Sequence, residues 1–80
     1  MKSKYIIIDE MGLELPIVFS HVIDHKTVAN GFCKVVSAGF CSTDMYEGYY
    51  DSVWGESVGL KIKSRGEQDK EILNLFLERD

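Results

Sequence analysis

Long apolar runs and proline are scarce in this sequence, and both shortages narrow what the protein can be. Behind Lys2 and Lys4, the apolar run Tyr5-Ile6-Ile7-Ile8 is short. A secretory signal needs roughly 7–15 apolar residues, and a membrane-spanning helix needs about 20. The chain has one proline and seven glycines, a composition that argues against disorder. We therefore expect a folded, cytoplasmic protein with no membrane segment.

Cysteine is also rare, which limits disulfide and metal chemistry. Cys33 and Cys41 flank one apolar segment. If that segment is a strand, its rise of about 3.3 Å per residue separates them by roughly 26 Å, whereas a disulfide needs Cα atoms within about 7 Å. His21 and His25 are the other soft metal ligands, but the cysteines lack the close spacing of a zinc site. We expect free thiols, no metal and no cofactor.

A large charge excess and a catalytic set are missing as well. The net charge is −4, with nine basic and thirteen acidic residues interspersed. This balance disfavours non-specific DNA binding, because affinity for nucleic acid rests largely on neutralising phosphates. A cysteine beside a histidine is formally possible, but a free cysteine usually packs as a small hydrophobe. We expect a non-enzymatic protein without catalytic residues.

What is present predicts a single α+β domain over residues 1–80, with the element order ββαββα. Residues 4–9 are apolar on both faces, as in an interior strand, and Met11-Gly12 forms a turn. Pro16 lacks an N–H, so the strand that contains it should lie at a sheet edge. The further predicted elements are a helix over 24–29, strands over 33–41 and 53–63, and a helix that follows the capping box Ser64-Arg65-Gly66-Glu67 to about residue 79. The expected fold is a four-stranded, mainly antiparallel sheet with the C-terminal helix packed on one face.

Pairing the last two strands as a hairpin centred near Glu47-Gly48 sorts their residues onto two faces. It places Phe40 opposite Trp54 and Val36 opposite Val58. One face is then apolar, and we expect the C-terminal helix to cover it through Ile72, Leu73 and Phe76. That apolar face comprises Val36, Ala38, Phe40, Trp54, Val58, Leu60 and Ile62.

The opposite face of this hairpin is rich in glycine and serine, which indicates close approach of something to the backbone. A ligand, another subunit or the N-terminal part of the chain could supply it. The alternating cations beyond it could hold an anion or could be the solvated face of an edge strand. The candidate ligand-binding residues are Lys61, Lys63, Arg65, Ser57, Ser37, Gly55 and Gly59.

Aromatic residues gather around the loop that joins these strands. The candidate partner-binding residues are Tyr46, Tyr49, Tyr50 and Trp54. Such a group can stack nucleic-acid bases or fill a protein contact. Because acidic residues surround it, a contact with a protein is the favoured interpretation.

The apolar residues of the last helix span an arc of roughly 200° at 100° per residue. A helix on one sheet needs a stripe only somewhat over 100° wide. A symmetric homodimer would cover the surplus, unless Leu75 is simply exposed. We expect a homo-oligomer.

Several short segments resemble small uncharacterised proteins of tailed bacteriophages and prophages. They are residues 35–40, 55–58 and 60–65, with Gly12-Leu13-Glu14 before Pro16, and His25 ahead of Val28-Ala29. The resemblance implies a genetic setting, in a bacterial host cell, rather than an activity. We expect an accessory protein that acts by binding, either occupying a host protein or sequestering an anionic small molecule. The alternative is a nucleic-acid-associated factor that uses Lys61, Lys63, Arg65 and the nearby aromatics.

Overall fold

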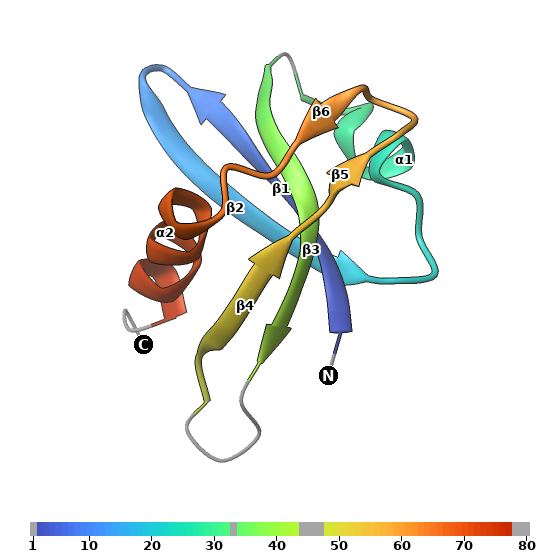
Figure 1. Ribbon diagram of the computed structural model, residues 1–80. Coiled ribbons are helices and arrows are strands. Elements are labelled where there is room, and N and C mark those ends of the chain that lie inside the picture. Colours follow the sequence, from blue (N-terminus) through green and yellow to red (C-terminus); the bar gives the residue numbers. More distant parts are fainter. Residues whose placement is uncertain (1, 33, 44–47, 78–80) are drawn as a thin grey trace.

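The computed structural model describes residues 2–32, 34–43 and 48–77. It is an α+β fold, as the sequence predicts, with a four-stranded sheet, a separate two-stranded hairpin and two helices (Figure 1). The elements are β1 (Lys2–Glu10), β2 (Leu13–Ser20), α1 (His25–Ala29), β3 (Val35–Thr43), β4 (Tyr50–Trp54), β5 (Glu56–Ser57), β6 (Ile62–Lys63) and α2 (Glu67–Leu77).

The main sheet is antiparallel and has the strand order β2-β1-β3-β4. Strand β1 lies inside it, which explains why both of its faces are apolar and why residues 5–8 are all buried. Strand β2 lies at an edge, so the prediction from Pro16 is confirmed. The turn between β1 and β2 places Met11 and Gly12 at φ values of 56° and 87°. Two consecutive left-handed residues give the tight hairpin turn that suits twisted strands.

The strand expected over residues 53–63 is divided among three strands, β4, β5 and β6, so that prediction is wrong. Strand β4 pairs with β3 and places Phe40 opposite Trp54, as predicted, but the ladder stops there. Gly55 follows at a φ of 86°, a conformation that a continuous strand does not use. The chain then forms the small β5–β6 hairpin. Val58 lies in the turn of this hairpin and is exposed, so it does not pair with Val36.

Helix α2 covers the sheet face opposite to the one we expected. Leu73 packs in one core cluster with Tyr5, Ile7 and Cys41, and this face also carries Ser37, whose hydroxyl donates to α2. At Ser37, the close approach predicted from the small residues is thus made by the C-terminal helix. The other core cluster holds Ile6, Ile8, Ala29 and Ala38, with Leu60 and Ile62 packed against it. In Figure 1, α2 and the pair formed by α1 and β5–β6 accordingly lie on different sides of the sheet.

A buried carboxylate connects α2 to the sheet. Asp69 is fully buried and accepts hydrogen bonds from the Tyr5 hydroxyl (2.5 Å), the Ser37 hydroxyl (3.0 Å), and the backbone N–H and Nε of Arg65 (2.9 and 2.8 Å). Arg65 also donates two bonds to Glu14 of β2, at 2.8 and 3.2 Å. Burial, followed by the hydrogen bond to Asp69, raises the pKa of Tyr5. The bond to Glu14 raises the pKa of Arg65.

The start of α2 differs from the predicted capping box. Ser64 accepts a bond from the Gly66 N–H at 3.0 Å, so the serine does cap the turn. The carboxylate that reaches back to the backbone belongs to Asp69 rather than to Glu67. Glu67 instead pairs with Lys70 on the exposed surface. The carboxylate that accepts from the backbone therefore lies two positions after the one that the capping box predicts.

Candidate functional site

The structure does not bring the seven predicted ligand residues together. Arg65 is engaged by Asp69 and Glu14, and Ser37 is buried against Asp69. Gly55 is the point where the strand breaks, with Phe40 so close that an added Cβ would lie 2.8 Å from its ring. Lys61 and Lys63 are exposed, and neither forms an ion pair among the described residues. Ser57 and Gly59, in contrast, line an open pocket.

The predicted aromatic group is also divided. Tyr46 lies outside the described residues, and Tyr49 is exposed. The backbone of Tyr50 is bonded by the side-chain amide of Asn74 on α2, which accepts from its N–H at 2.7 Å and donates to its carbonyl at 3.0 Å. Burial raises the pKa of the Tyr50 hydroxyl. Trp54 stacks on Phe40, with ring centroids 6.1 Å apart, and remains 41% exposed.

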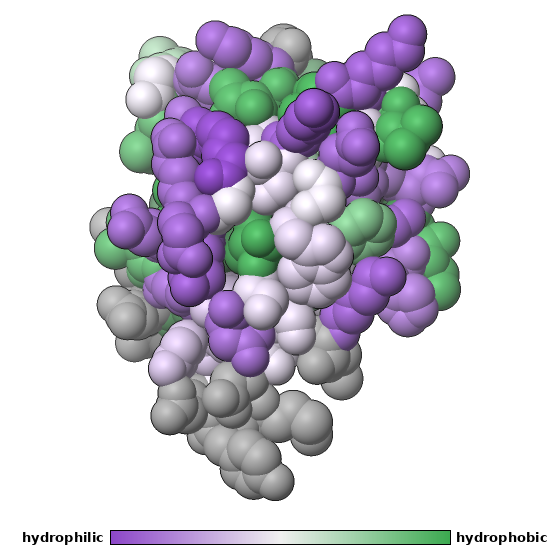
Figure 2. Space-filling view, viewed as in Figure 1, coloured by the Kyte–Doolittle hydropathy of each residue, from purple (hydrophilic) through white to green (hydrophobic). Residues whose placement is uncertain are grey.

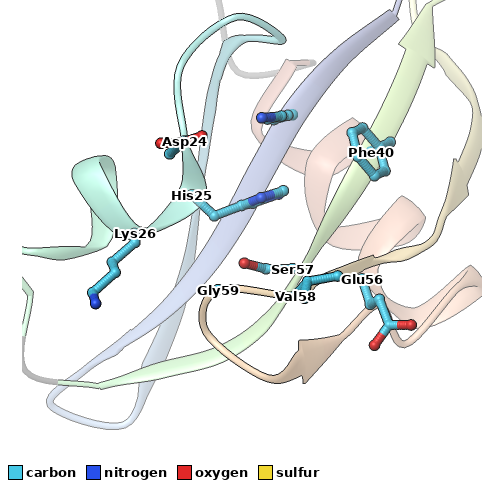
Figure 3. Close-up of a pocket in the computed structure, with 9 residues that line it drawn as sticks. Asp24, His25, Lys26, Phe40, Glu56, Ser57, Val58 and Gly59 are labelled. Carbon is cyan, nitrogen blue, oxygen red and sulfur yellow. The ribbon is translucent and has the colours of Figure 1, made fainter.

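The pocket that Ser57 and Gly59 line lies between α1 and the β5–β6 hairpin and has a volume of about 370 Å³. We call it the His25 pocket. Figure 3 shows residues of α1 on one side, with β3 and the β5–β6 segment across from them. Its lining residues are Lys4, Asp24, His25, Lys26, Phe40, Glu56, Ser57, Val58 and Gly59.

His25 is held in one orientation at the inner wall of this pocket. Its ring lies edge-on to Phe19 and Phe40, with centroids 5.5 and 5.7 Å away. Its Nε2 lies 2.8 Å from the carbonyl oxygen of Gly39. Because a carbonyl can only accept, Nε2 carries the proton of this bond, and in the neutral ring Nδ1 is left with a lone pair. The residue is only 6% exposed.

The second ring nitrogen of His25 is available for a further hydrogen bond. Nδ1 forms no hydrogen bond within the described part of the chain. In that same part, every side-chain nitrogen or oxygen that is fully buried has a partner. Nδ1 is therefore not fully buried, and His25 is one of the residues that line the pocket. A nearly buried side chain at the pocket thus keeps one lone pair that the described residues leave unbonded.

Four charged side chains line the same pocket as His25, two of each sign. Lys4 comes from β1, Lys26 from α1, Asp24 from the residue before α1, and Glu56 from β5. None of the four forms an ion pair with another residue that the structure describes. In Figure 3, the ends of the Lys26 and Glu56 side chains point outward and diverge from each other. Within the described ranges, the two ammonium groups therefore lack a salt-bridge partner.

The mouth of the pocket is shaped by the hairpin turn. The Ser57 hydroxyl accepts from the Leu60 N–H at 3.2 Å, which fixes the start of the turn. Gly59 has no side chain, and the nearest atom to an added Cβ would be the Cβ of Lys26, 4.0 Å away. The absence of a side chain at Gly59 keeps this side open.

Beyond the His25 pocket, a second open pocket of about 470 Å³ is lined by Lys2, Ser3, Ser20 and His21. Within the described ranges, no group of three or more histidine, cysteine or acidic residues could hold a metal ion. Cys41 is a buried free thiol, and Cys33 lies outside the described residues. No described helix is long and apolar enough to cross a membrane. Figure 2 shows apolar side chains on this face as separate small patches bordered by polar ones.

Sequence reasoning missed most of the residues of the His25 pocket. Lys4, Lys26 and Phe40 come from three elements and share no motif or spacing, so no local pattern marks them. His25 was considered as a metal ligand and as the histidine beside a cysteine, but not as part of an anion site. Comparisons with family models, curated proteins and solved structures find no match. The geometry of the pocket is therefore the basis for a proposed function.

Proposed function

We propose that this protein acts by binding a small anionic molecule in the His25 pocket, without catalysing a reaction. The observation that carries the proposal is His25, which is nearly buried, lines the pocket and is fixed on the Gly39 carbonyl through Nε2. Its Nδ1 has no hydrogen-bond partner among the described residues and is not fully buried. A fixed ring with one unbonded nitrogen at a pocket supports a ligand as the partner of that nitrogen.

The two lysines and the size of the pocket support an anionic ligand of modest size. Lys4 and Lys26 can both donate to an oxyanion, and charge-assisted hydrogen bonds are the stronger kind. A volume of about 370 Å³ lies at the lower end of the range for small-molecule sites. Phe40 and Val58 add apolar lining for an organic part. A small organic phosphate, sulfate or carboxylate fits this combination.

The resemblance to phage and prophage proteins supports the wider setting. In that setting the protein would be an accessory factor in the cytoplasm of a bacterial host cell, and binding an anionic metabolite would sequester it. We also infer that the protein forms a homo-oligomer, supported by Leu75, which is 59% exposed on α2. In the other form of this proposal, the protein binds to a host protein and occupies it, in place of a small molecule.

The test uses phenyl phosphate as the probe, because it joins an oxyanion to an apolar ring. Binding is followed by amide NMR shifts and by the fluorescence of Trp54, which stacks on the pocket residue Phe40. The double variant Lys4→Gln/Lys26→Gln removes both pocket cations. Each charge-assisted contact contributes about 1.5–3 kcal/mol, so we expect well over a tenfold loss of affinity.

The matched control is Lys61→Gln/Lys63→Gln, which changes the net charge equally but lies outside the pocket lining. We expect it to bind like the wild type. If only this control loses affinity, the anion binds at the lysines first considered from the sequence. If the wild type shows no shifts at pocket residues with millimolar probe, the proposed function is wrong.

One observation favours a second candidate, a single-stranded nucleic acid. Trp54 is partly exposed and stacked on Phe40, and the Lys2 ammonium lies 4.6 Å from the Phe40 ring centre. Aromatic platforms beside cations stack bases. Arg65, which the sequence suggested for this role, is bound to Glu14. A labelled oligothymidylate should then bind with an affinity that falls steeply as salt increases, whereas phenyl phosphate should depend on salt less.

A further inference from the structure

A neutral His25 cannot donate a hydrogen bond from Nδ1 to an oxyanion in the pocket. The Nε2 proton is committed to the Gly39 carbonyl, so the Nδ1 of the neutral ring can only accept. A fully ionised oxyanion also only accepts. Two lone pairs facing each other repel unless a proton lies between them. Donation to both partners at once requires the imidazolium form, in which both ring nitrogens carry hydrogen.

We propose that the His25 pocket binds its anion together with one proton, taken up by His25, and this inference rests on the proposed function. The protonated ring donates from Nδ1 to the ligand and from Nε2 to Gly39, so the ring does not have to turn. The ligand class is an organic oxyanion that holds its charge at acidic pH. The pocket binds such an anion more tightly as the solution becomes more acidic.

The groups around the ring allow this charge change. Lys4 from β1 and Lys26 from α1 oppose it, while Asp24 and Glu56, from the start of α1 and from β5, favour it. The neighbours from β2 and β3 are the uncharged rings of Phe19 and Phe40. The bound anion adds one further negative charge on the pocket side, which stabilises the protonated ring. By linkage, the complex then holds more protons than its free components.

The experiment uses phenyl sulfate, whose charge stays constant where histidine titrates, so any pH dependence belongs to the protein. Affinity is measured by calorimetry from about pH 5.5 to about pH 8, the range in which histidine changes charge. We expect the affinity to fall by about tenfold across this range. The heat, measured in two buffers with different ionisation enthalpies, should report uptake of close to one proton at the middle of the range. This measurement needs only the wild-type protein.

Two variants assign the proton. His25→Gln should lose the pH dependence, while His21→Gln, at the exposed second histidine, should keep it. If His25→Gln does not fold, the histidine C2 proton resonances of the wild type replace it, and only that of His25 should shift on binding. Phenyl sulfate that binds equally well at all pH values, without proton uptake, would overturn this inference and leave the proposed function standing. Failure of phenyl sulfate and phenyl phosphate to bind at any pH would overturn the proposed function itself.

Discussion

Replacing Asp69 with asparagine tests whether its carboxylate holds α2 on the sheet. Oδ2 accepts from the Tyr5 hydroxyl and the Arg65 N–H, and Oδ1 accepts from the Ser37 hydroxyl and the Arg65 Nε. In Asp69→Asn, one of these oxygens becomes an NH₂ group. Whichever oxygen is replaced, one N–H of Arg65 loses its acceptor and faces another donor, while the hydroxyl that shared that oxygen has to turn and accept instead. The guanidinium of Arg65 also loses one of its two counter-charges, since the carboxylates of Asp69 and Glu14 each lie 2.8 Å from it.

The expected loss is large for a domain of this size. Breaking a buried ion pair by removing one partner costs about 3–5 kcal/mol. The total stability of small domains is about 5–15 kcal/mol, so Asp69→Asn should lose about a fifth of it or more. Tyr5→Phe removes one of the donors and leaves the carboxylate charged. It should cost less, about 1–2 kcal/mol.

The assay is urea unfolding, followed by Trp54 fluorescence and by circular dichroism. The matched control is Glu67→Gln, the same acid-to-amide change two residues earlier on the same helix, where the carboxylate pairs with Lys70 on the surface. Surface pairs contribute about 0–1 kcal/mol. If Asp69→Asn costs no more than Glu67→Gln, the buried network does not hold the helix. If Asp69→Asn is unfolded outright, the smaller loss in Tyr5→Phe still measures the network.

Three further predictions concern the core, the thiol and the assembly. Leu73→Ala should cost about 2–5 kcal/mol because Leu73 is buried, whereas the same change at Leu13, which is 60% exposed, should change the free energy of unfolding by less than about 0.5 kcal/mol; equal losses in urea unfolding would contradict this. Burial raises the pKa of Cys41 to about 11. The folded thiol therefore keeps its proton at pH values where the unfolded thiol has lost it. Cys41 should thus add stability at neutral pH, and this contribution should fall as pH rises above about 9. A Cys41→Ala variant whose stability has the same pH profile as the wild type would refute this. Sedimentation at micromolar concentration should show a species larger than the 9.1 kDa chain, and a monomer would end the homo-oligomer proposal.

Local patterns predicted the sheet well and failed where the tertiary structure decides. The apolar run of β1, the edge position of Pro16 and the pairing of Phe40 with Trp54 all follow from alternation and turn chemistry. The break at Gly55 does not, because apolar alternation continues through residues 53–63 and a glycine is compatible with either outcome. The choice of face for α2 depends on Asp69, which looks in the sequence like an ordinary acidic residue in a first helical turn.

The candidate site was predicted less well than the fold, for a related reason. Two of the seven expected ligand residues, Ser57 and Gly59, line the His25 pocket. They were chosen on the assumption of one continuous strand, which would have placed them on a flat face beside Lys61. The broken strand instead folds them over α1, where His25 completes the pocket. A site formed by side chains from separate elements has no signature in local spacing.

The bonds from Asn74 to the backbone of Tyr50 have a consequence for how copies of this protein can meet. Tyr50 begins β4, an outer strand of the sheet, and Asn74 occupies both of its backbone groups as a neighbouring strand would. At the other outer strand, β2, Pro16 has no N–H that could donate to an added strand. Each border of the sheet therefore has one position where an added strand would lack a hydrogen bond. Self-assembly should then proceed through side-chain surfaces and not by extending the sheet, which also guards against fibrous aggregation.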